Sequence, residues 1–167
     1  MTRKHPSSPV TKKFKVQQSA TKVMATVFWD SRGMILLNIL PKGGSVNADR
    51  YCETLDQLRL LSSGVVLQHD NATPHTAKHT KEWLERYRWD IIPHPAHSPD
   101  LAPSDFHLFG PLKRHLGDKK FEDKDELISE VRDWFSKLDA NFFTQGIYSL
   151  LPRWQKCIAL HGDYIKK

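Results

Sequence analysis

The segment VVLQHDNATPHTA, residues 65–77, carries a predicted strand, an acidic residue after it and the start of a helix. It begins with a short apolar run, Val65 to Gln68, which predicts a buried strand. Asp70 follows this strand, and Pro74 opens a helix expected from about His75 to Tyr87. An acidic residue at the carboxyl end of a buried strand lies where α/β sheets present their ligand sites. The segment therefore indicates an α/β fold with a candidate site at Asp70.

A second candidate carboxylate, Asp105, lies in the first turn of a helix expected from Ser104. Each carboxylate could instead have a purely structural role, without binding a metal. Acidic residues are favoured at helix N-termini by the helix dipole alone, and Asp70 could be a turn residue that caps the helix after Pro74. Two carboxylates on adjacent elements are nevertheless sufficient protein ligands for Mg²⁺, which takes oxygen ligands from carboxylates, water and phosphate.

Upstream of the Asp70 segment, two apolar runs predict an antiparallel hairpin. These runs cover residues 22–29 and 34–40, and the turn 30–33 (DSRG) separates them. A helix capped by Asn47 is expected next, because its apolar residues from Tyr51 onward recur at spacings of three and four.

Downstream of the Asp70 segment, the pattern predicts one more strand and then helices. The strand covers residues 89–92, and a proline-rich loop follows over residues 93–103. Helices are expected from Ser104, over 121–138 and within 142–165. This order of strands and helices indicates an α/β layer fold with an antiparallel edge and helices on the faces of the sheet.

The charge of the chain is concentrated at its N-terminus. The net charge of the 167 residues is +6, but residues 1–22 hold six basic residues and no acidic ones, so the remainder is balanced. We therefore expect a basic arm over residues 1–21, which contacts phosphate through Lys12, Lys13 and Lys15 or acts as a nuclear import signal. The alternative is a disordered leader whose charge only maintains solubility.

The composition excludes several classes of protein. No run of 18 apolar residues occurs, which excludes a membrane-spanning helix. Two cysteines form neither a disulfide framework nor a zinc quartet. His75 and His79 have metal-ligand spacing on one helix face, but the glutamate of a zinc protease motif is missing between them. A zinc site is therefore not expected.

Longer motifs resemble those of mariner-family DNA transposases. They are HDNATPHTA (69–77), HPAHSPDLAPSDFHLFGPLK (94–113), RWQKCIALHGDYIKK (153–167), KVMATVFWDSRG (22–33) and NADRYCETLDQL (47–58). The resemblance extends from about residue 6 to the end, and the motifs occur in the order of the family. In addition, 34 residues separate Asp70 from Asp105, which is similar to the interval between the second and third catalytic aspartates of the family.

The resemblance implies an RNase H-like (integrase-type) fold, with a mixed sheet and helices on both faces. It also implies Mg²⁺- or Mn²⁺-dependent DNA cleavage and strand transfer at terminal inverted repeats, by a homodimer in the nucleus. Asp70 and Asp105 would be the catalytic metal ligands, and Asn71, His75 and His97 are our candidate DNA contacts. The same domain occurs fused to a histone methyltransferase whose third position resembles Asn, so Asp105 follows the active pattern more closely.

The chain departs from the family pattern at its N-terminus. The family's first catalytic aspartate lies on a central strand upstream of the hairpin, and nothing in residues 1–21 resembles that strand or a helix-turn-helix domain. We therefore predict a partial catalytic domain over residues 22–167, truncated at the N-terminus, that is inactive alone. Loss of the strand should leave two sheet edges unpaired or force a foreign pairing. The alternative is a non-catalytic, decayed or domesticated nucleic-acid-binding or interaction module.

Overall fold

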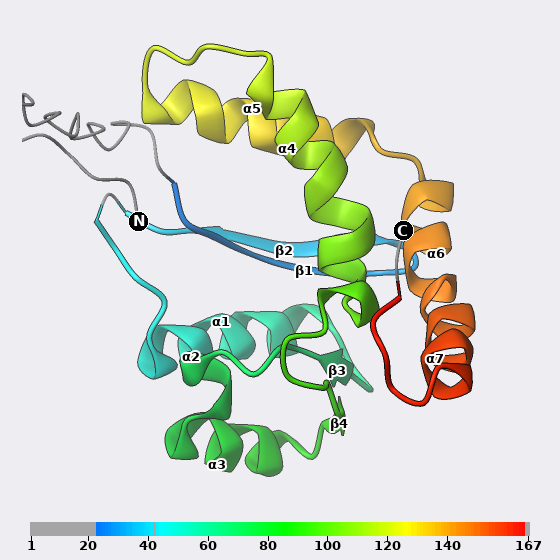
Figure 1. The fold of residues 1–167 in the computed structure, drawn as a ribbon. Helices are drawn as coiled ribbons and strands as arrows, with labels where there is room; N and C mark the ends of the chain where they lie inside the picture. The colour runs from blue at the N-terminus through cyan, green and yellow to red at the C-terminus, as the bar shows by residue number, and fades with distance from the viewer. Residues whose placement is uncertain (1–22, 42, 166–167) are drawn as a thin grey trace, which may run out of the picture.

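The computed structural model describes residues 23–41 and 43–165, so the basic arm with Lys12, Lys13 and Lys15 lies outside the described residues (Figure 1). Its elements are, in chain order, β1 (Ala25–Asp30), β2 (Gly33–Ile39), α1 (Ala48–Leu61), β3 (Val66–Gln68), α2 (Thr73–Thr76), α3 (Lys78–Tyr87), β4 (Asp90–Ile92), the 3₁₀ turn η1 (Pro99–Leu101), the π-helical turn η2 (Ser104–Leu108), α4 (Phe109–Gly117), α5 (Lys124–Lys137), α6 (Ala140–Tyr148) and α7 (Leu150–Ala159). No helix in the described ranges has both the length and the apolar character needed to span a membrane.

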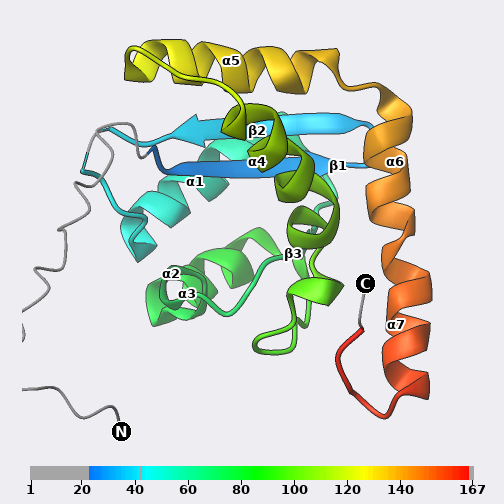
Figure 2. The same ribbon diagram turned by 45° about the horizontal axis from the view of Figure 1, so that its top comes forward.

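The four strands form two separate sheets (Figure 1, Figure 2). β1 and β2 pair antiparallel, from Ala25 opposite Ile39 to Asp30 opposite Gly33. β3 and β4 pair parallel, with Leu67 opposite Ile91. Within residues 23–41 and 43–165, no ladder joins β1 to β3. Of the two outcomes expected for the sheet, the described residues therefore show open strand edges and no foreign pairing.

The hairpin turn is held by the side chain of Asp30. Its Oδ1 accepts hydrogen bonds from the backbone N–H of Arg32 at 2.8 Å and of Gly33 at 3.1 Å. Burial by itself would raise the pKa of Asp30, but these bonds and the Arg32 guanidinium outweigh it and lower the pKa. The turn predicted over residues 30–33 is confirmed.

One core lies between the hairpin, α1 and the second sheet. Helix α1 begins after Asn47, whose side chain accepts a hydrogen bond from the Arg50 N–H at 2.9 Å. The buried members of this first core come from α1, β3 and α3, and they are Tyr51, Leu55, Leu58, Leu67 and Leu84. Phe28 and Leu36, which lie opposite each other on β1 and β2, pack against it.

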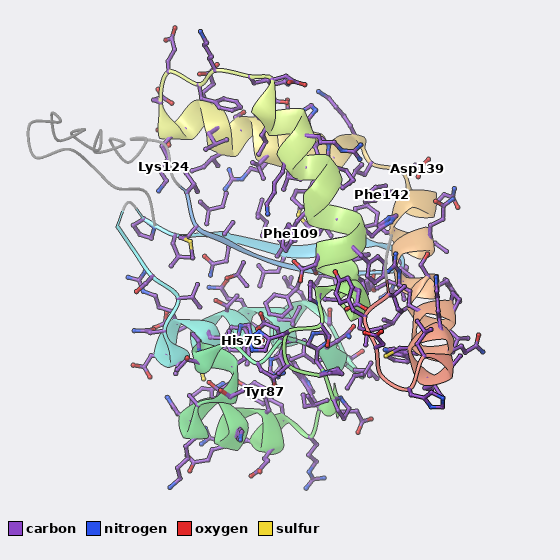
Figure 3. All side chains as sticks on the ribbon, in the orientation of Figure 1. His75, Tyr87, Phe109, Lys124, Asp139 and Phe142 are labelled. Carbon is purple, nitrogen blue, oxygen red and sulfur yellow. The ribbon has the colours of Figure 1, made fainter. Side chains whose placement is uncertain are left out.

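A second core covers the other face of the hairpin. Its buried residues come from η2, α4, α5 and α6, and they are Leu108, Leu112, Trp134, Phe135 and Phe143. Val27, Trp29 and Leu37 of the hairpin pack against this core. At the start of α5, Lys124 donates to the Leu40 carbonyl at 2.8 Å (Figure 3). The hairpin therefore has helices on both faces, as predicted: α1 on one side and α4, α5 and α6 on the other (Figure 1).

Three helical segments differ from the prediction. The helix expected from His75 to Tyr87 is broken at Ala77, whose ψ of 145° is extended. The break is stabilised by Thr80, whose hydroxyl donates to the Pro74 carbonyl at 2.6 Å. Helix α5 begins later than expected, because Asp123 caps it by accepting from the Glu126 N–H. The last segment forms two consecutive helices, α6 and α7.

An ion-pair cluster links α4 to α5, and it gives a pH-dependent prediction. Glu130 Oε1 lies 2.5 Å from Lys119 Nζ and 2.6 Å from His115 Nε2. The Lys119 hydrogen bond, followed by that of His115, lowers the pKa of Glu130 to about 2. Because this pKa is lowered on folding, the stabilisation is present above about pH 4.5 and is lost as the pH falls to about 2.

We expect Glu130→Gln to lower the midpoint of thermal unfolding at neutral pH, because the charge-assisted bonds weaken. The difference from the wild type should shrink as the pH is lowered from about 4.5 towards 2, since both proteins then carry a neutral group at residue 130. Calorimetric or circular-dichroism melting across this pH range measures it. A difference that does not change with pH would contradict the assignment.

Candidate metal site

Asp70 lies in the loop that joins β3 to α2, two residues after the strand ends. Its side chain is 59% exposed. Oδ1 accepts a hydrogen bond from the Ala72 N–H at 3.0 Å, and His75 Nδ1 lies 2.6 Å from the same oxygen. No residue in the described ranges donates a hydrogen bond to Oδ2. One oxygen of this carboxylate is therefore held in place and the other faces solvent.

Asp105 lies in η2, where its backbone N–H donates to the Ala102 carbonyl at 2.9 Å. Its position in the first turn of this helical region is as predicted, although the turn is π-helical. Rare π-helical turns occur frequently at functional sites. The residue is exposed, and in the described part of the chain no hydrogen bond reaches its carboxylate.

Three hydrogen bonds between distant segments tie the elements of this site together. Gln68, at the end of β3, donates to the Leu101 carbonyl at 3.0 Å. Asn71 donates to the His94 carbonyl at 2.8 Å. Trp29 of β1 donates through Nε1 to the Ser104 hydroxyl at 3.0 Å, next to Asp105. These bonds fasten the proline-rich loop to the end of β3 and η2 to β1.

The two carboxylates lie within range of each other's charge. Although Asp105 is exposed as a residue, partial desolvation of its carboxyl raises its pKa above the ordinary value, and the negative charge of Asp70 raises it further, against the attraction of Lys113 and His94. Burial would also raise the pKa of Asp70, but the hydrogen bonds from Ala72 and His75 outweigh it and lower the pKa. Two neighbouring carboxylates that repel each other favour a cation between them.

The donor set suits one hard divalent ion. Carboxylate oxygens are the ligands that Mg²⁺ and Mn²⁺ accept, and the open Oδ2 of Asp70 and the unbonded carboxylate of Asp105 supply two of them. Across the described part of the chain, no group of three or more histidine, cysteine, aspartate or glutamate side chains could hold a metal. Asp70 and Asp105 therefore fit a single ion. The described residues supply no further carboxylate that could bridge this ion to a second one.

An aromatic stack that the sequence did not predict lies behind Asp70. The Tyr51 hydroxyl lies 2.8 Å from His69 Nδ1. The rings of His69 and His75 are parallel to within 5°, with centroids 5.1 Å apart, and the Tyr51 ring lies 4.2 Å from that of His75. Burial, with a smaller effect from His75, lowers the pKa of His69 to about 4, so His69 is neutral at pH 7. In the sequence, Tyr51 has only the signature of an apolar helix position.

The candidate DNA contacts do not all lie together. A groove of about 360 Å³ adjoins Asp70, between α3 and the end of β4. Asn71 and His75 line it, together with Lys81, Trp89 and other residues of these elements. His97 lies apart from this groove, in an exposed turn with a φ of 55°.

Comparison with known proteins identifies relatives of this chain. The family model described as "Transposase (partial DDE domain)" matches residues 3–63. The Mariner Mos1 transposase of Drosophila mauritiana is 36% identical over 172 residues, which cover 96% of this chain and 50% of that protein. The histone-lysine N-methyltransferase SETMAR of Homo sapiens is 33% identical over 153 residues, which cover 86% of this chain and 22% of that protein. The chain thus spans half or less of each relative.

Solved structures give the same result. The Mos1 transposase catalytic domain with Raltegravir and Mg superposes with a TM-score of 0.83 at 36% identity, over 86% of this chain and 77% of that one. The Mos1 paired-end complex with the left transposon end superposes with a TM-score of 0.85 at 35% identity, over 99% of this chain and 51% of that one. These matches confirm the RNase H-like fold predicted from the sequence.

Proposed function

Because the chain belongs to the mariner family of transposases, we propose that it supplies two metal-binding carboxylates to a DNA-cleaving and DNA-joining catalytic domain. The supporting observation is that a hydrogen bond from Gln68 to the Leu101 carbonyl holds the segments of Asp70 and Asp105 together, within range of each other's charge. Solved structures of the related Mos1 catalytic domain contain Mg or Mn, which favours the same ions here.

Each carboxylate has a defined task in this proposal. A bound Mg²⁺ or Mn²⁺ supplies Lewis-acid stabilisation of charge on a phosphoryl oxygen. Asp70 would hold the ion through Oδ2, because its Oδ1 is held by the Ala72 N–H and His75. Asp105 presents a carboxylate that is free of hydrogen bonds from the described residues. Lys113 lies near enough to lower the pKa of Asp105 and adds positive charge for a DNA phosphate.

The substrate in this proposal is DNA with terminal inverted repeats, bound by two copies of the protein in the nucleus. Mos1 has been solved as paired-end complexes and as a strand transfer complex, which supports DNA as the partner. We place a DNA strand beside Asp70 along the groove lined by Asn71 and Lys81. His97 and the arm lysines Lys12, Lys13 and Lys15 remain candidate contacts to more distant phosphates.

The metal assignment is tested by Mn²⁺ binding to the purified chain. We expect Asp70→Asn and Asp105→Asn each to weaken binding at least about tenfold, because each removes a charged oxygen ligand. Isothermal titration calorimetry or the electron paramagnetic resonance signal of free Mn²⁺ measures the affinity. Asp133→Asn is the matched control, because that side chain is 62% exposed on α5 and pairs only with Lys137 among the described residues. Unchanged affinity in both site variants would refute the assignment.

DNA binding by the chain is expected to be weak and strongly dependent on salt, because lysines of a basic arm contact phosphates. Replacing Lys12, Lys13 and Lys15 by glutamine should flatten the plot of log affinity against log salt by roughly 0.9 for each phosphate that is no longer neutralised. Fluorescence anisotropy with duplexes of matched and scrambled sequence measures both. Sequence-specific binding at physiological salt that needs no metal would favour the non-catalytic binding module instead.

A further inference from the structure

The carboxylate of Asp70 is held asymmetrically. Both of its hydrogen-bond contacts in the described structure, from the Ala72 N–H at 3.0 Å and from His75 Nδ1 at 2.6 Å, reach Oδ1. The Ala72 bond fixes the distance between this oxygen and the loop backbone. The His75 contact approaches from α2 and therefore fixes the direction in which the carboxylate plane faces. Oδ2 is left as the oxygen that a ligand can reach.

His75 is itself restrained, although α2 has only four residues. Its side chain is only 20% exposed. The Tyr51 ring of α1 and the His69 ring after β3 both contact it, with centroids 4.2 Å and 5.1 Å away. Tyr51 is 2% exposed and belongs to the first core. In Figure 3, His75 lies where α2 approaches α1.

The stack also limits what else His75 can do. Its Nδ1 contacts the Asp70 side chain and lies 3.3 Å from the Asp70 carbonyl. With Nδ1 in use and two rings packed against its own, His75 can contact a DNA phosphate only through Nε2. Nδ1 is therefore committed to Asp70.

We propose that His75 is a positioning residue, which Tyr51 and His69 hold in place and which fixes the rotamer of Asp70 so that Oδ2 faces the ion site. This inference rests on the proposed role of Asp70 as a metal ligand. Outer-shell partners that orient ligating groups typically change metal affinity about 10- to 100-fold when they are removed. The stack thus connects the buried first core to an exposed carboxylate.

The orientation of Asp70 can be measured in the full chain without metal. Three-bond coupling constants give the χ1 populations of Asp70 by nuclear magnetic resonance. We expect one rotamer to dominate in the wild type and rotamer averaging in His75→Ala. His75→Asn should retain the single rotamer, because its Nδ2 takes the place of Nδ1. His79→Ala is the matched control, because His79 pairs with Asp49 at 3.0 Å elsewhere on the surface. The same χ1 populations of Asp70 in the wild type and in His75→Ala would overturn the inference.

Mn²⁺ affinity separates this inference from the proposed function. We expect binding to weaken about tenfold in His75→Ala and to recover in His75→Asn. If the wild type keeps Asp70 in one rotamer but binds no Mn²⁺, the metal assignment fails and the positioning role stands. If the wild type and His75→Ala bind Mn²⁺ equally, the positioning role fails and the metal assignment stands. Tyr51→Phe, which removes only the hydroxyl bound to His69, provides a second variant should His75→Ala unfold.

Discussion

In the presence of Mg²⁺ or Mn²⁺, the purified 167-residue chain is expected to leave a duplex with mariner terminal inverted repeats uncut. Two-metal phosphoryl transfer requires ions at both the attacking and the leaving oxygen, and therefore a carboxylate that bridges them. Asp70 and Asp105 form a pair, and residues 23–41 and 43–165 contribute no third metal-binding side chain to it. Denaturing gels after several hours of incubation measure the outcome, with an active mariner transposase as the positive control.

Two further variants make this result decisive. Nicking by the chain that disappears in Asp70→Asn would contradict the prediction, whereas nicking that persists in this variant would identify a contaminating nuclease. Extending the chain upstream with a family strand that carries the first aspartate is the gain-of-function comparison. Cleavage by the extended chain, and not by the 167-residue chain, is the expected pattern.

Leu55→Ala is expected to lower the free energy of unfolding by about 3–5 kcal/mol, because it opens a cavity in the first core. Leu55 is fully buried, with 0% exposure, and packs between the hairpin and the second sheet. A loss of this size is a large part of the roughly 5–15 kcal/mol that stabilises a typical domain. Urea unfolding followed by tryptophan fluorescence measures it.

Leu60→Ala is the control for this core variant. Leu60 belongs to the same helix and has the same side chain, but it is 86% exposed. Its replacement should change the free energy of unfolding by less than about 0.5 kcal/mol. Similar losses in the two variants would mean that α1 does not hold the two sheets together.

The parts of the fold that depend on local pattern could be predicted from the sequence. The hairpin, α1 and the strand before Asp70 follow from apolar periodicity and from caps such as Asn47. The approach of Asp70 and Asp105 could not be derived this way, because hydrogen bonds between distant segments, such as Gln68 to Leu101, create it. Their pairing was predicted only from the resemblance to the family.

The aromatic stack behind Asp70 could not be predicted from the sequence, for a related reason. Tyr51 and His69 are 18 positions apart, and their contact depends on how α1 packs against β3. Periodicity assigned Tyr51 correctly to the core but could not show that its hydroxyl faces a histidine. The break between α2 and α3 was missed because a single side-chain bond, from Thr80 to Pro74, stabilises it.

The division of the four strands into two pairs affects how the chain behaves at high concentration. Within the described residues, β1 pairs only with β2, and β3 only with β4. Open strand edges are templates for extended segments of other molecules, and natural proteins cover or charge them to avoid aggregation. We therefore expect self-association through β1 and β3 to compete with folding, and solubility to fall as copies of the chain accumulate.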